Sequence, residues 1–433
     1  MDLLPNWLKS LLAVLAVLGG VGGIVSAARS VLRWRSASRR AEGGGRDSFH
    51  RAELGGRRDH RFQYQVATTE QLELLLGKEL FRLRGNGPRD EVASQSGEEP
   101  EVAAPEAHEY RVWFGTNRRP VDETDISRGF SARRGGSVYY GCCDVQVPES
   151  HRIGSVGSSA LHRLLRWTDD RLRIRRITRI ETERFWQSVA RQLGELPYGE
   201  RNAVIFIHGY NVSFEAAAIR AAQLGFDLGV GTMAFFSWPS RGRTTRRAYQ
   251  SDGQTVGASE KAIADFLVEF TNRCGADAVH LIVHSMGNQG VLRAVNRIVA
   301  DAERRDSCRF GQIILAAADV DADTFASLAA AYRQLAARTT LYVSQRDLAL
   351  RASAWFAEYP RVGLYPPVSV FDGIDTVSVS NVDLTLIGHG YVGGARDVLQ
   401  DMHRLIFSGE PPPRFGLNRR KNGDGKTYWE VGA

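Results

Sequence analysis

The sequence predicts an α/β fold in which a mostly parallel central sheet carries helices on both faces. Short runs of apolar and β-branched residues recur along the chain. Between them lie stretches in which apolar residues return every three or four positions. Short apolar strands that alternate with helices are typical of a parallel sheet buried on both sides.

The expected elements begin after residue 108. Two early strands are expected at residues 110–116 and 138–147, with Gly135 and Gly136 in the connection. Six later strands are expected at residues 203–207, 232–237, 278–283, 311–316, 339–343 and 376–380. Helices are expected at residues 181–193, 213–228, 259–272, 290–304, 324–336 and 398–407.

Length and composition exclude several classes of protein. The chain has 433 residues, of which 43% are hydrophobic and 24% are charged, so global disorder is excluded. Four cysteines are too few for a disulfide scaffold, and none stands in a CxxC pair or at zinc-ligand spacing from a histidine. We therefore expect reduced, buried thiols and a chemistry that needs no metal and no cofactor.

The charge pattern points away from nucleic acid. The net charge is +7, and residues 29–40 carry five arginines and no acid, whereas the charged residues of 90–106 are all acidic. A nucleic-acid binder would place basic residues on a reading helix or among stacking aromatics. The pattern fits a membrane-proximal basic collar followed by a solvated linker.

The N-terminus predicts a single-pass membrane anchor. Residues 10–28 are nineteen uncharged, mostly apolar residues, which reach roughly 28 Å as a helix. A cleaved signal peptide is the alternative, with Ser26 and Ala28 before the cut. The arginines that follow favour the anchor and a cytoplasmic C-terminal side. Gly19 and Gly23 form a small-residue face that could pair two such helices into a homo-oligomer.

We expect three parts along the chain: an anchor at residues 1–28, a linker at 29–108 and the α/β domain at 109–433. The linker contains one amphipathic helix at about residues 68–84. Thr68 and Gln71 can form its capping box. The leucines that share one face of this helix are Leu72, Leu75, Leu76, Leu80 and Leu83.

Ser285 is the candidate nucleophile. It lies in His284-Ser285-Met286-Gly287-Asn288, between an expected strand and an expected helix. A serine on such a sharp turn presents its hydroxyl above the sheet, and Gly287 supplies the small residue that the turn needs. Val283 stands where the motif usually has glycine. The alternative is a serine that only caps the helix.

A second motif follows an earlier strand, in His208-Gly209-Tyr210-Asn211. Gly209 lets the backbone turn so that the Tyr210 amide can face the serine. Together with the Met286 amide it would form an oxyanion hole. The alternative is a plain left-handed turn beside a histidine whose ring is already hydrogen-bonded within the fold.

A serine nucleophile needs a histidine base and a carboxylate, in the chain order serine, acid, histidine. Only His389 and His403 follow Ser285. We prefer His389, because it lies in a glycine-flanked loop, whereas His403 lies in an expected helix. For the acid we prefer Asp347 over Asp319, because Asp347 follows the strand at which this arrangement usually places the acid.

At these motifs the chain resembles a bacterial family of α/β-hydrolases without a settled substrate. The shared features are the strand end at residues 206–211 (FIHGYN), that at 236–240 (FSWPS), the turn at 284–288 (HSMGN) and the late Gly388-His389. The opening at residues 113–118 (WFGTNR) is also similar. The resemblance spans about residues 109–408. It implies an α/β-hydrolase fold and a serine mechanism with Ser285, Asp347 and His389 at matching positions.

These observations lead to an expected function. The chain is expected to be a membrane-tethered serine hydrolase that cleaves an ester-type, lipid or acyl substrate. An amidase or thioesterase would use the same residues, and a non-catalytic membrane-tethered adaptor is a further alternative. Arg241, Arg243, Arg246 and Arg247 could hold an acidic substrate group, or could simply face solvent.

Overall fold

The computed structural model describes residues 108–156, 171–241, 246–344, 350, 353, 359–379 and 392–432. The expected membrane span, the linker and its helix at 68–84 lie outside these residues. Within the described ranges, no helix is both long and apolar enough to cross a lipid bilayer.

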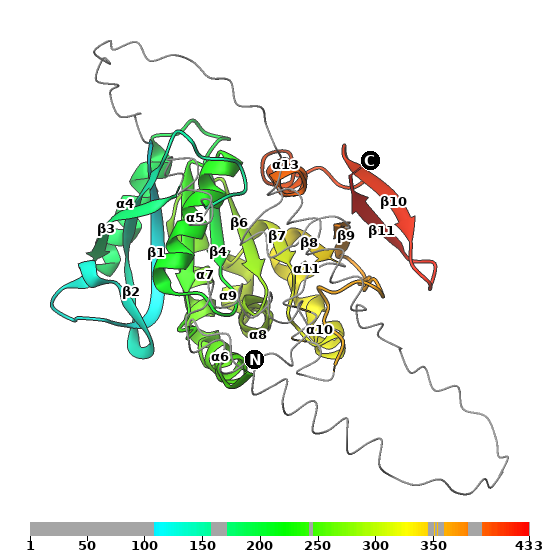
Figure 1. Ribbon diagram of the computed structural model, residues 1–433, viewed down its shortest axis with the longest axis horizontal. Helices are drawn as coiled ribbons and strands as arrows, with labels where there is room; N and C mark the ends of the chain where they lie inside the picture. The colour runs from blue at the N-terminus through cyan, green and yellow to red at the C-terminus, as the bar shows by residue number, and fades with distance from the viewer. Residues whose placement is uncertain are drawn as a thin grey trace, which may run out of the picture. The chain divides into compact units, whose positions relative to one another are not determined.

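The described residues form one eleven-stranded sheet, ordered β10-β11-β9-β8-β7-β6-β4-β5-β1-β2-β3 (Figure 1). One edge is antiparallel and contains β1 (His108–Pro120), β2 (Phe130–Val147) and β3 (Arg173–Ile180). The opposite edge is the hairpin of β10 (Leu417–Lys421) and β11 (Thr427–Val431). The parallel strands between them are β4 (Asn202–Ile207), β5 (Thr232–Ser237), β6 (Ala278–His284), β7 (Phe310–Ala316), β8 (Ala336–Ser344) and β9 (Asp375–Val379).

Helices cover both faces of this sheet (Figure 1). One face carries α5 (Phe214–Leu228) and α13 (Val392–Phe407), which share a buried apolar cluster. The other face carries the remaining helices. They are α4 (Thr182–Gly194), α6 (Arg246–Ala258), α7 (Glu260–Arg273), α8 (Gly287–Val299), α9 (Ala302–Ser307), α10 (Ala322–Leu328) and α11 (Tyr332–Leu335).

The alternation of side chains along each strand explains why both faces of the sheet are apolar. In β4, Ile205 and Ile207 belong to the cluster beneath α7 and α8, whereas Val204 and Phe206 belong to the cluster beneath α5. Successive side chains of a strand point to opposite faces, so both sets must be apolar. The continuous apolar runs that predicted these strands are therefore a direct consequence of helices on both sides.

Helix boundaries follow their capping residues. The Ser213 hydroxyl accepts a hydrogen bond from the Ala216 amide and begins α5. Gly229, with φ of 66°, ends the same helix in the left-handed conformation that glycine adopts without strain. The expected helix at residues 213–228 is confirmed with these limits.

The strand order reverses at β4, and this positions the candidate site. The chain passes from β4 to β5 on one side and returns to place β6 on the other side of β4. In open parallel sheets, ligands bind beyond the carboxyl ends of the strands at such a switch point. The ends of β4 and β6 are the places where the sequence puts Gly209 and Ser285.

Several expectations are corrected. Gly135 and Gly136 lie inside the long strand β2, not in a connection. The expected helix at residues 290–304 is divided into α8 and α9, and that at 324–336 into α10, a short 3-10 turn and α11. Residues 246–258, for which no helix was expected, form α6, and three strands (β3, β10 and β11) were not expected. The four cysteines are free and buried, as predicted.

His280 of β6 makes the stability of the fold depend on pH. Burial lowers the pKa of this imidazole from 6.5 to about 4. The unfolded chain therefore takes up a proton that the folded chain does not, and the stabilisation present above about pH 6.5 is lost as the pH falls toward 4. One such group changes the free energy of unfolding by about 1.4 kcal/mol per pH unit within that window.

We expect His280→Gln to reduce the slope of unfolding free energy against pH between about 6 and 4.5. Denaturant unfolding at several pH values measures this slope. The exposed His108, replaced by glutamine, is the matched control. A His280→Gln slope equal to that of the wild type would show that this histidine does not titrate in the way its burial implies.

Candidate active site

Ser285 lies on a strained turn between β6 and α8. Its φ is +50°, which is unusual for a residue with a side chain. The strain is held by surrounding hydrogen bonds. The Ser285 amide donates to the Ala316 carbonyl at 3.0 Å, and the Ser285 carbonyl accepts from the Asn288 and Asp319 amides. A serine in this conformation between a strand and a helix is typical of a nucleophile elbow.

The turns after β4 and β6 come into direct contact, and two glycines permit it. A Cβ on Gly209 would lie 2.7 Å from the Ser285 Cβ. A Cβ on Gly287 would lie 2.5 Å from the His208 carbonyl oxygen. The structure thus brings the two sequence motifs together. Val283 stands where this motif usually has glycine. Its side chain is fully buried in the core cluster beside α8.

The same contact gives a testable result. Glycine-to-alanine changes in a helix usually stabilise by up to about 1 kcal/mol. For Gly287→Ala we expect the opposite, a loss of about 1–3 kcal/mol, because the methyl group would meet a backbone oxygen that cannot move freely. Denaturant unfolding measures it. Gly194→Ala at the end of α4 is the control, since its Cβ meets nothing within 4 Å. Equal effects at the two sites would contradict this account.

The candidate oxyanion residues flank this contact. Met286 is buried and directly precedes α8. Tyr210 follows Gly209, and its ring packs against Tyr249 of α6 with centroids 5.4 Å apart. Met286 thus directly follows Ser285 in the chain, whereas Tyr210 follows Gly209, whose turn lies against Ser285. The role of their amides remains a prediction.

Asp347 and His389 lie outside the described residues, so their positions relative to Ser285 remain predictions. The alternative acid, Asp319, and the alternative base, His403, lie within the described residues. The Asp319 carboxylate accepts hydrogen bonds from Tyr249 at 2.8 Å and from Ser353 at 2.6 Å, and pairs with Arg361 at 3.3 Å. His403 Nδ1 donates to the Leu228 carbonyl at 3.0 Å. Both alternatives are thus engaged in contacts that hold the fold together.

His208 is a neutral structural histidine. Its Nε2 lies 3.5 Å from Arg118 Nη2 and 3.1 Å from Ser237 Oγ. Since a guanidinium can only donate, Nε2 is the acceptor and Nδ1 carries the proton, which it donates to the Gly209 carbonyl at 2.9 Å. Burial, and next the charge of Arg118, lower the pKa of His208 to about 3. Because burial disfavours the protonated ring and Nε2 already accepts hydrogen bonds, His208 is poorly suited to take the proton of Ser285 near pH 7.

Arg118 is a buried charge beneath the candidate oxyanion loop. It is 1% exposed, and no carboxylate of the described residues pairs with it. Its guanidinium donates to the Val212 carbonyl at 2.8 Å, to the Ser240 carbonyl at 3.1 Å and to Ser237 Oγ at 2.8 Å. Burial lowers its pKa to about 10, so it stays charged at neutral pH. Arg118 therefore ties the loop after β4 to the loop after β5.

Asp252 of α6 holds the same loops from the other side. Its carboxylate accepts from Ser240 Oγ at 2.6 Å and from the Arg241 amide at 3.0 Å. Ser240 Oγ in turn accepts from the Val212 amide at 3.2 Å. The sequence analysis did not identify either residue as functional, although Arg118 ends the motif at residues 113–118. The sequence signal that could have indicated them is a charged residue within or beside a motif made otherwise of apolar or small residues.

Comparisons with known proteins gave one matching family and alignments to solved structures. Residues 188–403 match the model of a family described as alpha/beta hydrolase of unknown function (DUF900). A solved structure of a cold-adapted esterase from an Arctic intertidal metagenomic library aligns with 71% of this chain and 99% of its own, at 14% identity and a TM-score of 0.30. A candidate cell surface hydrolase from Lactobacillus plantarum aligns with 49% and 93%, at 9% identity and a TM-score of 0.26. No curated protein matches the sequence.

The matched region thus belongs to an α/β-hydrolase family whose substrate is unassigned, and the resemblance noted in the sequence is confirmed. The mostly parallel sheet with helices on both faces agrees with that membership. In the part of the chain that the structure describes, no cluster of three or more histidine, cysteine or acidic side chains could hold a metal ion.

Proposed function

We propose that this protein is a serine hydrolase that cleaves ester-type substrates through an acyl-enzyme formed on Ser285. The observation that carries the proposal is the strained φ of Ser285 at the end of β6, with the Gly209 turn packed directly against it. A serine that only caps a helix needs neither this backbone conformation nor a glycine turn from a neighbouring strand. Both features serve to expose a hydroxyl beside backbone donors.

The proposed mechanism uses groups of the chain alone. His389 accepts the proton of Ser285, whose oxygen attacks the ester carbonyl carbon. The Tyr210 and Met286 amides stabilise the oxyanion that develops. His389 then donates its proton to the departing alcohol, which leaves the acyl group on Ser285. Water, activated by His389, releases the acid and restores the serine.

Asp347 is the proposed partner of His389, and it would hold the imidazole in the tautomer that can accept the serine proton. The contacts of Asp319 support this assignment, because its carboxylate is already engaged with Tyr249, Ser353 and Arg361. The contact of His403 with Leu228 likewise supports His389 as the base.

We further propose that residues 1–28 anchor the enzyme in a membrane as a single helix, with residues 29–108 as linker and the catalytic domain from 109 onward in the cytoplasm. The uncharged residues 10–28 and the arginines after them support this arrangement. An anchored enzyme would meet lipid or acyl esters at the membrane surface.

Labelling with a fluorophosphonate probe tests the proposal. Such probes phosphonylate an activated serine and spare ordinary ones. We expect the full-length chain to be labelled on the peptide that contains Ser285, and the Ser285→Ala variant not to be labelled. Absence of Ser285-dependent labelling in folded protein would instead favour a non-catalytic adaptor that uses the hydrolase fold.

A further inference from the structure

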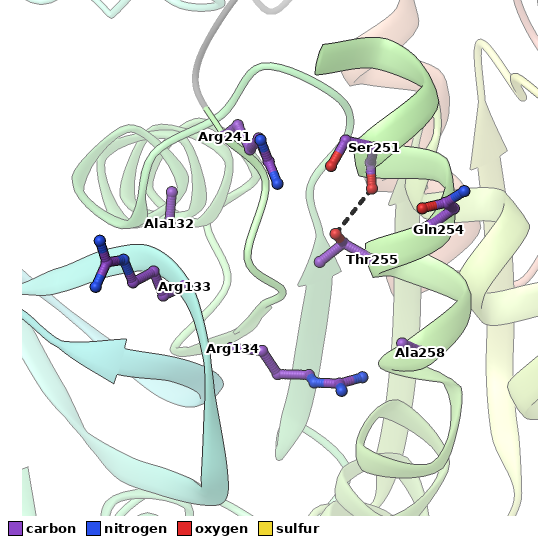
Figure 2. A pocket seen from close by; sticks show the side chains of 8 residues that line it. All are labelled: Ala132, Arg133, Arg134, Arg241, Ser251, Gln254, Thr255 and Ala258. Atoms are coloured by element: carbon purple, nitrogen blue, oxygen red, sulfur yellow. Dashed lines mark hydrogen bonds between the residues drawn. The ribbon is translucent and has the colours of Figure 1, made fainter. Parts of the chain in front are cut away.

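A cleft lies between the start of β2 and the helix α6. Its volume is about 770 Å³, and Figure 2 shows it open between the two elements. The residues that line it are Ala132, Arg133, Arg134, Arg241, Ser251, Gln254, Thr255 and Ala258. Three of the eight are arginines and none is acidic, so the cleft is a concentrated positive site.

The arginines come from two separate parts of the chain. Arg133 and Arg134 belong to β2, whereas Arg241 follows the loop after β5. In Figure 2 the side chain of Arg134 extends toward α6, and that of Arg241 extends into the same space. None of the ion pairs within the described part of the chain includes these arginines. Their charges are therefore not neutralised by any carboxylate that the structure describes.

The neighbouring acid is turned away from the cleft. Asp252 lies next to Ser251 in α6, but its carboxylate is buried and accepts hydrogen bonds from Ser240 and from the Arg241 amide. This arrangement leaves the Arg241 side chain on the cleft side while its backbone is fixed. A positive cleft with a fixed backbone suits a negatively charged ligand.

Polar groups on α6 complete the lining. Thr255 Oγ1 donates to the Ser251 carbonyl at 2.8 Å, a bond drawn in Figure 2. The Ser251 hydroxyl and the Gln254 amide belong to the same stretch of helix and can each donate to an anionic oxygen. Guanidinium groups with added hydroxyl and amide donors form the usual setting for phosphate or carboxylate recognition.

The opposite side of α6 is connected to the candidate active site. Tyr249 donates to Asp319, whose amide donates to the Ser285 carbonyl. Asp252 holds Ser240, which accepts from the Val212 amide in the loop after Gly209. The cleft and Ser285 therefore share one supporting helix and one pair of loops.

We propose that this cleft binds an anionic ligand that carries a phosphate or a carboxylate group. Arg134 and Arg241 bind the negative charge, and the Ser251 hydroxyl and the Gln254 amide donate to the anionic oxygens. The cleft is a site separate from the candidate active site, because none of its lining residues belongs to the turns around Ser285.

Calorimetry measures anion binding without catalysis. Full-length Ser285→Ala protein is titrated calorimetrically at low salt with phenyl phosphate, with benzoate and with neutral phenol. We expect both anions, or one of them, to bind and phenol not to bind, which also distinguishes phosphate from carboxylate recognition. Arg134→Gln combined with Arg241→Gln is expected to weaken binding about tenfold or more.

The matched control is Arg175→Gln on β3, an exposed arginine that lies outside the cleft. It should leave anion binding at the level of the parent protein. Binding that is equally weakened by Arg175→Gln, or unaffected by the double substitution, overturns the proposal. Circular dichroism of each variant shows whether a loss reflects unfolding.

Discussion

Replacing Ser285 by alanine is expected to lower kcat/KM for an activated acyl ester by about 10⁴- to 10⁶-fold, because members of a catalytic triad act as a unit. The hydroxyl has no other described task, since the hydrogen bonds that fix this turn come from the backbone and from Asn288. Stability should change little, and alanine relieves none of the strain at a φ of +50°. Steady-state hydrolysis of a nitrophenyl ester measures the loss.

Ser327→Ala is the control for this prediction. Ser327 is exposed, and its hydroxyl donates only to the Thr324 carbonyl within the structure described. Its activity should equal that of the wild type. If Ser285→Ala kept more than a small fraction of the hydrolysis, a different nucleophile would be responsible.

Arg118→Met is expected to produce the largest loss of stability, about 3–5 kcal/mol. Methionine roughly fills the space of the aliphatic stem but cannot donate to the carbonyls of Val212 and Ser240 or to the Ser237 hydroxyl. Each buried acceptor left without its donor costs about 1–3 kcal/mol. In variant protein that still folds, the loop that carries Tyr210 would lose its anchor. We expect kcat to fall about 10²-fold, as when one oxyanion donor is lost.

The neighbouring Arg119 provides the comparison. It is exposed and pairs with Glu123 at 3.4 Å, so Arg119→Met should change stability by less than about 1 kcal/mol. Urea unfolding and kcat are measured for both variants. An Arg118→Met protein as stable and active as Arg119→Met would show that the buried guanidinium does not position the loop.

The parallel centre of the sheet could be predicted from sequence because each strand there is buried on both faces. Residues 232–237 were predicted with the limits that β5 has, and five other strands differ by a few residues at their ends. A continuous apolar run can be assigned as a buried strand when the segments on either side have apolar residues at helical spacing. The hydrophobic pattern alone thus carries this part of the fold.

The missed strands lie at the two edges of the sheet, where that signal is weak. Residues 173–180 read RIRRITRI, and this arginine-rich strand, β3, pairs on one side only. Charged residues are common on edge strands because they prevent further pairing. The hairpin of β10 and β11 is similarly polar, with residues 417–421 reading LNRRK.

The helix α6 was missed for a related reason. It contains Gly253 and Gly257 and carries a buried aspartate, Asp252, where an apolar residue would be expected. Its inward positions are Tyr249, Asp252 and Val256, spaced as one helical face. The buried Asp252 is explained by its hydrogen-bond partners in the loop after β5. Such tertiary contacts do not appear in the spacing of apolar residues along the sequence.

The candidate site was only partly predictable. Gly209, Ser285 and Gly287 were found because each has a steric requirement that leaves a local motif in the sequence. Arg118 acts through carbonyl groups more than ninety positions away, so its role emerges only in the folded chain. Asp347 and His389 remain predictions that rest on chain order and on the family resemblance.

The pH dependence of fluorophosphonate labelling at Ser285 tests the central claim most directly. Labelling rates are compared in the full-length wild type, in His389→Gln and in His403→Gln. The account predicts a wild-type rate that rises through a single ionisation near pH 7, a loss of about 10³-fold or more in His389→Gln, and near-normal labelling in His403→Gln. Rapid labelling of Ser285 in His389→Gln would contradict the proposal that His389 activates this serine.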